Sequence, residues 1–174
     1  MIQKNKIGII GCGWLGLPLA KLLLQNKYSV KGSTTSKEKL QILQNQKINP
    51  YLIEIKENEI KGDIDSFMLG LDILIINIPP KMKSNPNSKY SKKIESLNNF
   101  IKSKSINKIL FISSTSVYGS NKGKVDSNTV PIPNSENGLE ILKSEEILNK
   151  NKNCTIIRFG GLIGKNRHPV YFLS

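Results

Sequence analysis

The chain has 174 residues and a formal net charge of +13, and 38% of its residues are hydrophobic but only 6% aromatic. This length is typical of one domain, and the absence of a membrane-span-length apolar run and of a signal-peptide pattern predicts no membrane partner. Basic surfaces attract nucleic acid, but the charge is scattered lysine without arginine forks or aromatic platforms, so we expect no nucleic-acid partner.

An apolar run at 6–10 predicts a first buried strand, and the segment Gly11-Cys12-Gly13-Trp14-Leu15-Gly16 follows it directly. A helical apolar pattern over 14–26 comes next, so this G-x-G-x-x-G lies in the strand–turn–helix context of a dinucleotide site. Gly11 allows the sharp turn, Gly13 lets a pyrophosphate approach the backbone, and Gly16 lets the helix pack closely on the sheet. Helix N–H groups would hold the phosphates. The predicted cofactor-binding residues here are Gly11, Gly13, Trp14, Leu15 and Gly16.

The remaining elements alternate between strands and helices. Strands are predicted at 28–33, 51–55, 72–78, 108–113 and 154–159. Helices are predicted at 36–46 with Ser36 as N-cap, at 90–103 and at 139–150, with one short helix between 57 and 70. Loops are predicted at 81–89 and 119–135. Six strands with intervening helices predict an α/β fold, a Rossmann-type doubly wound parallel sheet with helices on both faces, as one domain over 1–174.

Ligands of such sheets bind at the carboxyl ends of the strands. In this chain those ends are 11–16, 33–37, 77–80, 113–116 and 159–161. Polar segments therefore meet at one edge, which adds Asn77, Ile78, Pro79 and Ser113 to the predicted cofactor-binding residues. The two cysteines, Cys12 and Cys154, fit no metal-binding spacing. We expect no metal site and a reducing, cytoplasmic location.

The choice of cofactor depends on the end of the second strand. NAD-binding folds carry an acid about twenty residues after the glycines, which binds the ribose 2′-hydroxyl. Here the sequence has Ser33, Thr34, Thr35 and Lys37 and no acid before residue 38. Hydroxyls and an ammonium group suit a 2′-phosphate, which favours NADP over NAD. The alternative is that these residues only cap the second helix.

Ser113-Ser114-Thr115-Ser116-Val117-Tyr118-Gly119 resembles the S-S-x-x-V-Y-G segment of extended short-chain dehydrogenase/reductases, the NAD-dependent epimerase/dehydratase family. The resemblance covers essentially the whole chain. The glycine fingerprint and 167–169 look like an atypical branch described as nucleoside-diphosphate-sugar epimerases. Further similar residues are Val125, Asp126, Pro131, Pro133, Gly138, Glu145, Glu146, Ile156-Ile157-Arg158 and Gly160-Gly161-Leu162-Ile163-Gly164.

The resemblance assigns the catalytic serine of this family to Ser114, whose hydroxyl would hydrogen-bond the reacting oxygen of the substrate; the alternative is a serine that caps a turn. The family also uses a Tyr-x-x-x-Lys pair, in which tyrosinate is the acid/base and the lysine lowers its pKa. The positions of that pair fall on Asn137 and Ile141, which have neither property. Tyr118 belongs to the V-Y-G element and Lys143 is out of register, so neither replaces the pair.

Family members continue into a smaller substrate-binding lobe, and the resemblance implies that most of this lobe is absent from these 174 residues. His168, the only histidine, is expected to be a surface-loop residue. The resemblance leaves open a homodimer through helices 90–103 and 139–150. Three hypotheses remain, in this order. The first is an atypical NAD(P)-dependent epimerase or oxidoreductase acting on a nucleotide sugar, the second a catalytically silent NAD(P)-binding sensor or scaffold, and the third a nucleic-acid binder.

Overall fold

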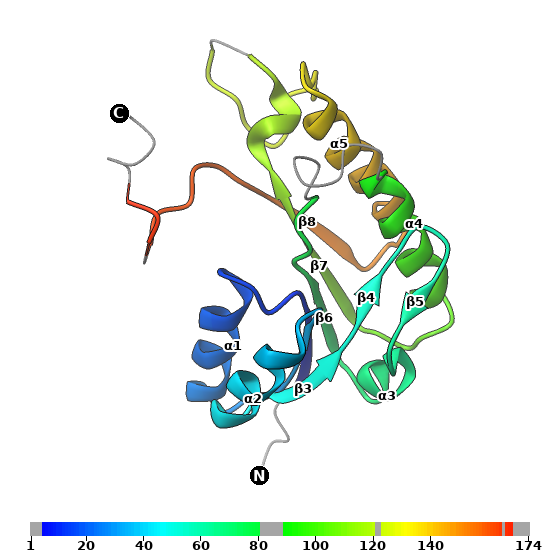
Figure 1. The fold of residues 1–174 in the computed structure, drawn as a ribbon. Helices are drawn as coiled ribbons and strands as arrows, with labels where there is room; N and C mark the ends of the chain where they lie inside the picture. Colours follow the sequence, from blue (N-terminus) through cyan, green and yellow to red (C-terminus); the bar gives the residue numbers. More distant parts are fainter. Residues whose placement is uncertain (1–4, 81–88, 121–122, 165, 169–174) are drawn as a thin grey trace.

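The computed structural model describes residues 5–80, 89–120, 123–164 and 166–168. Its main sheet has six parallel strands in the order β3-β2-β1-β6-β7-β8 (Figure 1). The strands are β1 (Lys6–Ile10), β2 (Ser29–Thr34), β3 (Asn49–Leu52), β6 (Ile73–Ile76), β7 (Lys108–Ser114) and β8 (Cys154–Phe159). The chain moves outward from β1 to β3 and then returns past β1 to β6. The predicted doubly wound Rossmann-type fold is confirmed, with its topological switch between β1 and β6.

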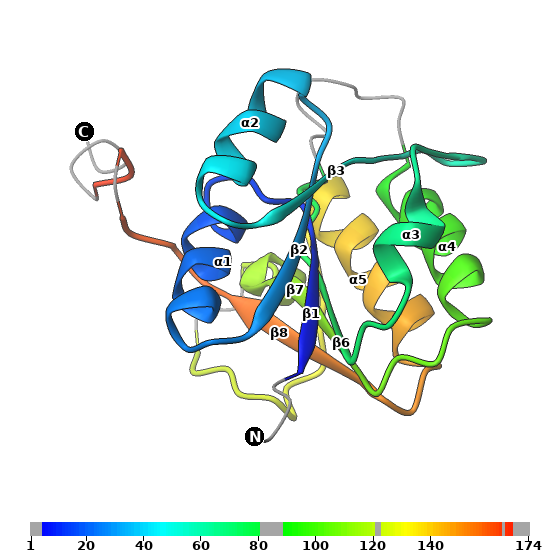
Figure 2. The ribbon, with the colours of Figure 1, turned by 90° about the horizontal axis from the view of Figure 1, so that it is seen from below.

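Helices cover both faces of the sheet. Figure 2 shows α1 (Gly16–Gln25) and α2 (Lys37–Asn45) on one side, and α3 (Ile64–Met68), α4 (Tyr90–Ile101) and α5 (Glu136–Leu148) on the other. No helix in the ranges described above is both long and apolar enough to cross a bilayer.

Two hydrophobic clusters lie on the two faces, because side chains of a strand alternate between them. On β6, Ile75 packs with the α1 and α2 cluster, whereas Leu74 and Ile76 pack with the cluster under α3, α4 and α5. Burial on both faces explains why the central strands are continuous apolar runs. The first cluster also contains Ile7, Ile9, Ala20, Val30, Leu43 and Ile48, and the second also contains Phe67, Ile94, Leu97, Ile109 and Phe111.

The prediction of a single strand over 51–55 is wrong. The segment forms two strands, because β3 ends at Leu52 and β4 (Glu54–Ile55) pairs antiparallel with β5 (Ile60–Lys61) outside the main sheet. The N–H of Ile53 still donates to the Thr34 carbonyl at 3.0 Å, which is the last bond to β2. At Gly62, φ is +100° and a Cβ would lie 2.0 Å from the Leu52 carbonyl oxygen. Glycine therefore lets the hairpin fold back onto β3.

Other boundaries differ by a few residues. The helix expected from 139 begins at Glu136, because the Ser135 hydroxyl caps it by accepting the Gly138 N–H at 3.1 Å. Ser36 is the N-cap of α2 as predicted, but its hydroxyl donates to the Glu38 carboxylate and accepts no helix N–H. A short 3-10 helix, η1 (Thr115–Tyr118), precedes the predicted loop from 119. The loop expected at 81–89 lies outside the described residues except for Lys89.

A buried carboxylate joins α4 to α5. Glu140 is 5% exposed and accepts hydrogen bonds from the Ser91 N–H (2.9 Å) and hydroxyl (2.7 Å), and from the Lys143 ammonium (3.0 Å). Burial raises the pKa of this carboxyl, but these hydrogen bonds outweigh it and hold the pKa below its usual value. A carboxyl whose pKa is lower in the folded state stabilises the fold above its unfolded pKa. That contribution disappears as the pH falls through the folded pKa.

Glu140→Gln is therefore expected to lower the free energy of unfolding by about 1–2 kcal/mol near neutral pH, and by much less at about pH 3. Urea unfolding at several pH values, followed by circular dichroism, measures the difference. Glu146→Gln, at an exposed position of the same helix, is the control and should stay near the wild-type value at each pH. Equal losses for Glu140→Gln at both pH values would contradict the assigned role of the charge.

Candidate functional site

A cavity of about 590 Å³ opens at the carboxyl ends of the central strands. Its lining includes residues 10–15, 33–35, 77–80, 112–114 and 159–160, which overlap all five strand-end segments named above. The structure thus brings together nearly all of the predicted cofactor-binding residues. Two of them do not line the cavity: Gly16 lies behind it, and Lys37 lies outside it.

The three glycines of the loop have different surroundings. At Gly11, φ is +99° and a Cβ would lie 2.3 Å from the Asn77 carbonyl oxygen. At Gly16 a Cβ would lie 2.3 Å from the Gly11 carbonyl oxygen, and the Asn77 side-chain amide donates to this same oxygen at 2.9 Å. At Gly13 a Cβ would meet no atom within 4 Å. Packing therefore requires glycine at 11 and 16, whereas at 13 the fold leaves space that a ligand can use.

Helix α1 begins at the cavity with neither a side-chain cap nor an acidic residue in its first turn. In this turn the Leu17 N–H donates to the Gly13 carbonyl at 3.0 Å and Pro18 has no N–H, so the Gly16 N–H and the positive end of the helix dipole are what an anion can use. Cys12 of the glycine loop is 4% exposed and packs in the hydrophobic cluster on the α1 and α2 face of the sheet. Burial raises the pKa of this thiol to about 12, so it stays protonated and has a packing role.

The end of β2 supports the glycine loop and lines the cavity. The buried Ser33 hydroxyl accepts the Gly11 N–H at 3.1 Å, and the Ser33 carbonyl accepts the Cys12 N–H at 2.8 Å. Thr34 and Thr35 follow along the wall. The lysine of α2 that lines the cavity is Lys39, which was not among the residues predicted from the sequence. Positions two apart on a helix point in nearly opposite directions, so Lys37 faces away when Lys39 faces the cavity.

At the end of β7, Ser113 and Ser114 line the cavity but have different partners. The Ser114 hydroxyl accepts the Ser116 N–H at 3.1 Å and caps η1, which leaves the hydroxyl proton available to a ligand. The buried Ser113 hydroxyl donates to the Glu145 carboxylate at 2.5 Å. Ser113 is therefore held by a carboxylate of α5, whereas Ser114 is the better donor toward the cavity.

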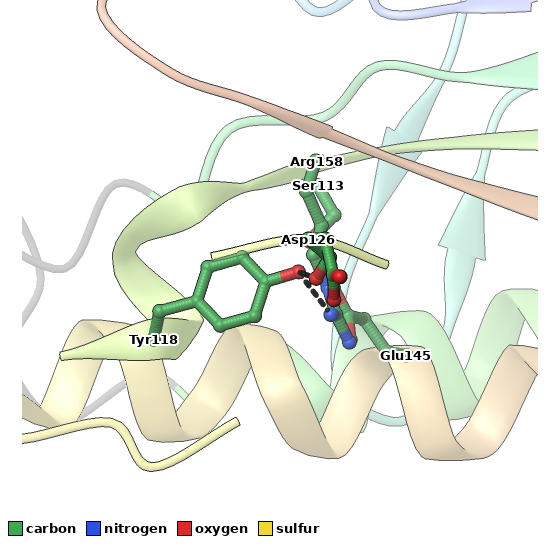
Figure 3. A network of polar contacts seen from close by, with 5 residues as sticks. All are labelled: Ser113, Tyr118, Asp126, Glu145 and Arg158. Atoms are coloured by element: carbon green, nitrogen blue, oxygen red, sulfur yellow. Dashed lines mark hydrogen bonds and ion pairs between the residues drawn. The ribbon is translucent and has the colours of Figure 1, made fainter. Parts of the chain in front are cut away.

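A network of polar contacts supports this end of the sheet (Figure 3). The Arg158 guanidinium on β8 donates to the Glu145 carboxylate from Nε (2.9 Å) and Nη2 (2.7 Å). Its Nη1 donates to the Tyr118 hydroxyl at 2.8 Å, and that hydroxyl donates to the Asp126 carbonyl at 2.7 Å. The hydrogen bond to Glu145 raises the pKa of Arg158. Both sides of the Tyr118 hydroxyl are therefore occupied in this network.

The wall formed by α5 is apolar where the family resemblance requires a cation. Ile141 is 4% exposed and lines the cavity. Asn137 lies one turn earlier, and Lys143 pairs with Glu140 outside the cavity. Tyr90 of α4 also lines the cavity, but its hydroxyl donates to the Ile78 carbonyl at 2.7 Å and burial raises its pKa. No tyrosine–lysine pair of this type is present among the described lining residues.

Three further charged residues of the cavity wall were not predicted. They are Glu54 of β4, Lys93 of α4 and Arg167, which follows β8. Glu54 and Lys93 carry no local sequence signal, because their place in the wall depends on how the hairpin and α4 pack. Arg167 belongs to the motif at 167–169, but that pattern did not indicate that it approaches the glycine loop.

These features fit a dinucleotide. The open space at Gly13, the uncapped N-terminus of α1 and the hydroxyls at the end of β2 form one continuous wall. In a fold of this class the pyrophosphate lies against the glycine loop, with the adenosine toward β2 and the nicotinamide toward β7. The cavity extends past the glycine loop, the end of β2 and the end of β7.

Comparison with known proteins agrees with this geometry. The chain is 31% identical to protein YeeZ of Escherichia coli over 174 residues, which covers 98% of this chain and 63% of that protein. It is 28% identical to the uncharacterized UDP-glucose epimerase YtcB of Bacillus subtilis, covering 94% of this chain and 58% of YtcB. The chain thus spans less than two thirds of the length of these relatives.

Solved structures share the fold. A conserved protein of Silicibacter pomeroyi superposes with a TM-score of 0.75 at 19% identity, over 98% of this chain and 57% of that one. The UDP-glucuronic acid 4-epimerase of Bacillus cereus, in complex with UDP-glucuronic acid and NAD, gives 0.74 at 23% identity, over 94% and 59%. Residues 6–122 match the family described as the NAD binding domain of 6-phosphogluconate dehydrogenase. This match includes the glycine loop, β2 and the end of β7, and the chain accordingly belongs to this family of NAD-binding domains.

Proposed function

We propose that this chain is the NAD(P)-binding domain of a nucleoside-diphosphate-sugar epimerase or dehydratase of the extended short-chain dehydrogenase/reductase type. The observation that carries the proposal is the cavity, in which an open Gly13 and an uncapped helix meet the Ser113–Ser114 strand end. The similarity to YtcB, named as a UDP-glucose epimerase, supports the substrate class. The bound nicotinamide would supply a hydride acceptor or donor.

Ser114 would orient the substrate in this proposal. Its hydroxyl oxygen already accepts the Ser116 N–H, so its proton is free to donate to a carbonyl or alkoxide oxygen of the sugar. Ser113 would keep the strand end in place through Glu145. The proton of the reaction requires a donor other than Asn137 or Ile141, such as water or a group outside the described residues.

A catalytically silent NAD(P)-binding sensor or scaffold is the second candidate. The apolar Ile141 in the cavity wall favours it, because no cation is present there to lower the pKa of an acid/base. Turnover with UDP-glucose, measured by NMR as the appearance of an epimerised or dehydrated UDP-sugar, separates the two candidates, because the nicotinamide would be reoxidised within each cycle and its absorbance would not accumulate. Cofactor binding without any turnover would support the silent module.

Titration with NADPH and NADH tests the binding site itself. Trp14, the only tryptophan, lies in the glycine loop and lines the cavity, so its fluorescence should be quenched saturably by either dinucleotide. Tighter binding of NADPH supports the assignment of NADP, and tighter binding of NADH removes it. Binding of neither cofactor would contradict the proposed function.

The proposed preference for NADP rests on the residues at the end of β2. Lys39→Ala is expected to weaken NADP(H) about tenfold, because a charge-assisted hydrogen bond to the 2′-phosphate is lost, and to leave NAD(H) affinity unchanged. Lys37→Ala tests the lysine predicted from the sequence and should have a smaller effect, since Lys37 does not line the cavity. Isothermal titration calorimetry of both variants with both cofactors measures this difference. Equal losses for NAD(H) and NADP(H) in Lys39→Ala would contradict a 2′-phosphate contact.

A further inference from the structure

Two sequence motifs that lie far apart in the chain are in contact. After β8 the chain crosses to the side of the sheet that α1 covers (Figures 1 and 2). There Gly164 and Arg167 exchange backbone hydrogen bonds of 3.3 and 2.9 Å. The Arg167 guanidinium carbon lies 4.3 Å from the centre of the Trp14 ring. The turn therefore rests on the glycine loop through a cation–π contact.

The turn is fitted closely to the indole. A Cβ at Gly164 would lie 2.8 Å from Cζ2 of Trp14, so only glycine allows this approach without displacement. Asn166 has a φ of +62°, a left-handed conformation that asparagine tolerates better than most residues. The absent side chain of Gly164 and the left-handed backbone of Asn166 thus both favour the turn that places Arg167 over Trp14.

The two arginines of the chain differ in their counter-charges. Arg158 pairs with Glu145, at 2.7 Å, inside the network at the end of β8. Arg167 lines the cavity, and no carboxylate of the described residues forms an ion pair with it. Trp14, on which Arg167 is stacked, belongs to the loop that leads into the positive end of α1. Positive charge without an acidic partner gathers at this point of the cavity, which suits an anionic ligand.

We propose that Arg167, stacked on Trp14, is a binding residue for the pyrophosphate of the dinucleotide. This inference rests on the proposed NAD(P) site and adds a contact from outside the glycine fingerprint. The indole holds the guanidinium plane while its N–H groups remain able to donate to phosphate oxygens, a geometry that lysine does not provide. The backbone bridge between Gly164 and Arg167 brings this cation to the loop.

Isothermal titration calorimetry with three ligands tests the proposal. Arg167→Ala should weaken NADP⁺ and ADP, which both carry a diphosphate, about tenfold or more, and leave adenosine 2′-monophosphate unchanged. Arg167→Lys should recover only part of the loss. Gly164→Ala, which keeps Arg167 but displaces its turn from the indole, should show the same selective loss. Lys21→Ala, at an exposed position of α1, is the control for a lost positive charge and should bind like wild type.

Several outcomes would overturn the inference. Unchanged affinity of Arg167→Ala for NADP⁺ and ADP, with normal binding by wild type, removes Arg167 from the site and leaves the proposed function intact. An equal loss for adenosine 2′-monophosphate would indicate a general charge effect. In a fourth titration, with UDP-glucose, a loss confined to that ligand would assign Arg167 to a substrate diphosphate instead. Failure of the wild-type chain to bind any dinucleotide would contradict the proposed function itself. It is therefore distinguishable from a failure of the inference about Arg167.

Discussion

Replacing Gly13 by alanine is expected to weaken NADP(H) or NAD(H) by more than tenfold while the fold keeps its stability. A Cβ at Gly13 meets no protein atom within 4 Å, and Gly13 is not among the glycines with positive φ. The methyl group would therefore occupy the space that we propose for the pyrophosphate. The free energy of unfolding should stay the same or rise by up to about 1 kcal/mol, since alanine restricts the unfolded chain. Titration calorimetry and urea unfolding measure the two quantities.

Gly16→Ala is the matched comparison three residues along the same loop. Its Cβ would lie 2.3 Å from the Gly11 carbonyl oxygen and 3.0 Å from Nδ2 of Asn77. Backbone must move to admit it, so stability should fall by about 1–3 kcal/mol. If Gly13→Ala binds both dinucleotides like wild type, the glycine loop does not hold the phosphates. If Gly13→Ala instead unfolds easily, the space beside Gly13 is not available as described.

Glu145→Ala is expected to have the largest effect on stability. The carboxylate has a 3% exposed side chain and accepts from two Arg158 nitrogens and from the Ser113 hydroxyl. Removing it leaves a guanidinium without a counter-charge, a loss of about 3 kcal/mol. This value is near the low end for buried pairs, because the Arg158 side chain retains 21% exposure and can be partly hydrated. Urea unfolding by circular dichroism measures the loss.

Two further variants distinguish an unpaired charge from a packing defect. Glu145→Ala combined with Arg158→Met removes both charges and should regain part of the lost stability. Glu95→Ala breaks the pair between Lys92 and Glu95, whose side chains are 55% and 44% exposed, and should leave the free energy of unfolding close to the wild-type value. No recovery in the double variant would show that the cavity left by the carboxylate, rather than the unpaired Arg158, causes the loss.

Local patterns in the sequence correctly predicted the order of the main elements and the glycine loop. The apolar run at 6–10 and the G-x-G-x-x-G after it depend on nearest neighbours, so they could be interpreted without the fold. The convergence of strand ends also followed, because parallel strands carry their carboxyl ends to one edge. The pattern of polar and apolar residues and the spacing of the glycines were sufficient for these conclusions.

The tertiary structure decided which side chains actually face the cavity. The phase of α2 selects Lys39 over Lys37, and packing places Ile141 in the wall. The division of 51–55 into β3 and β4 depends on where β2 ends, and the stack of Arg167 on Trp14 joins residues 153 positions apart. The sequence by itself determined the architecture and the class of ligand, because these follow from periodicity and local turn chemistry. The partners of individual side chains follow from contacts between distant segments, which only the folded chain specifies.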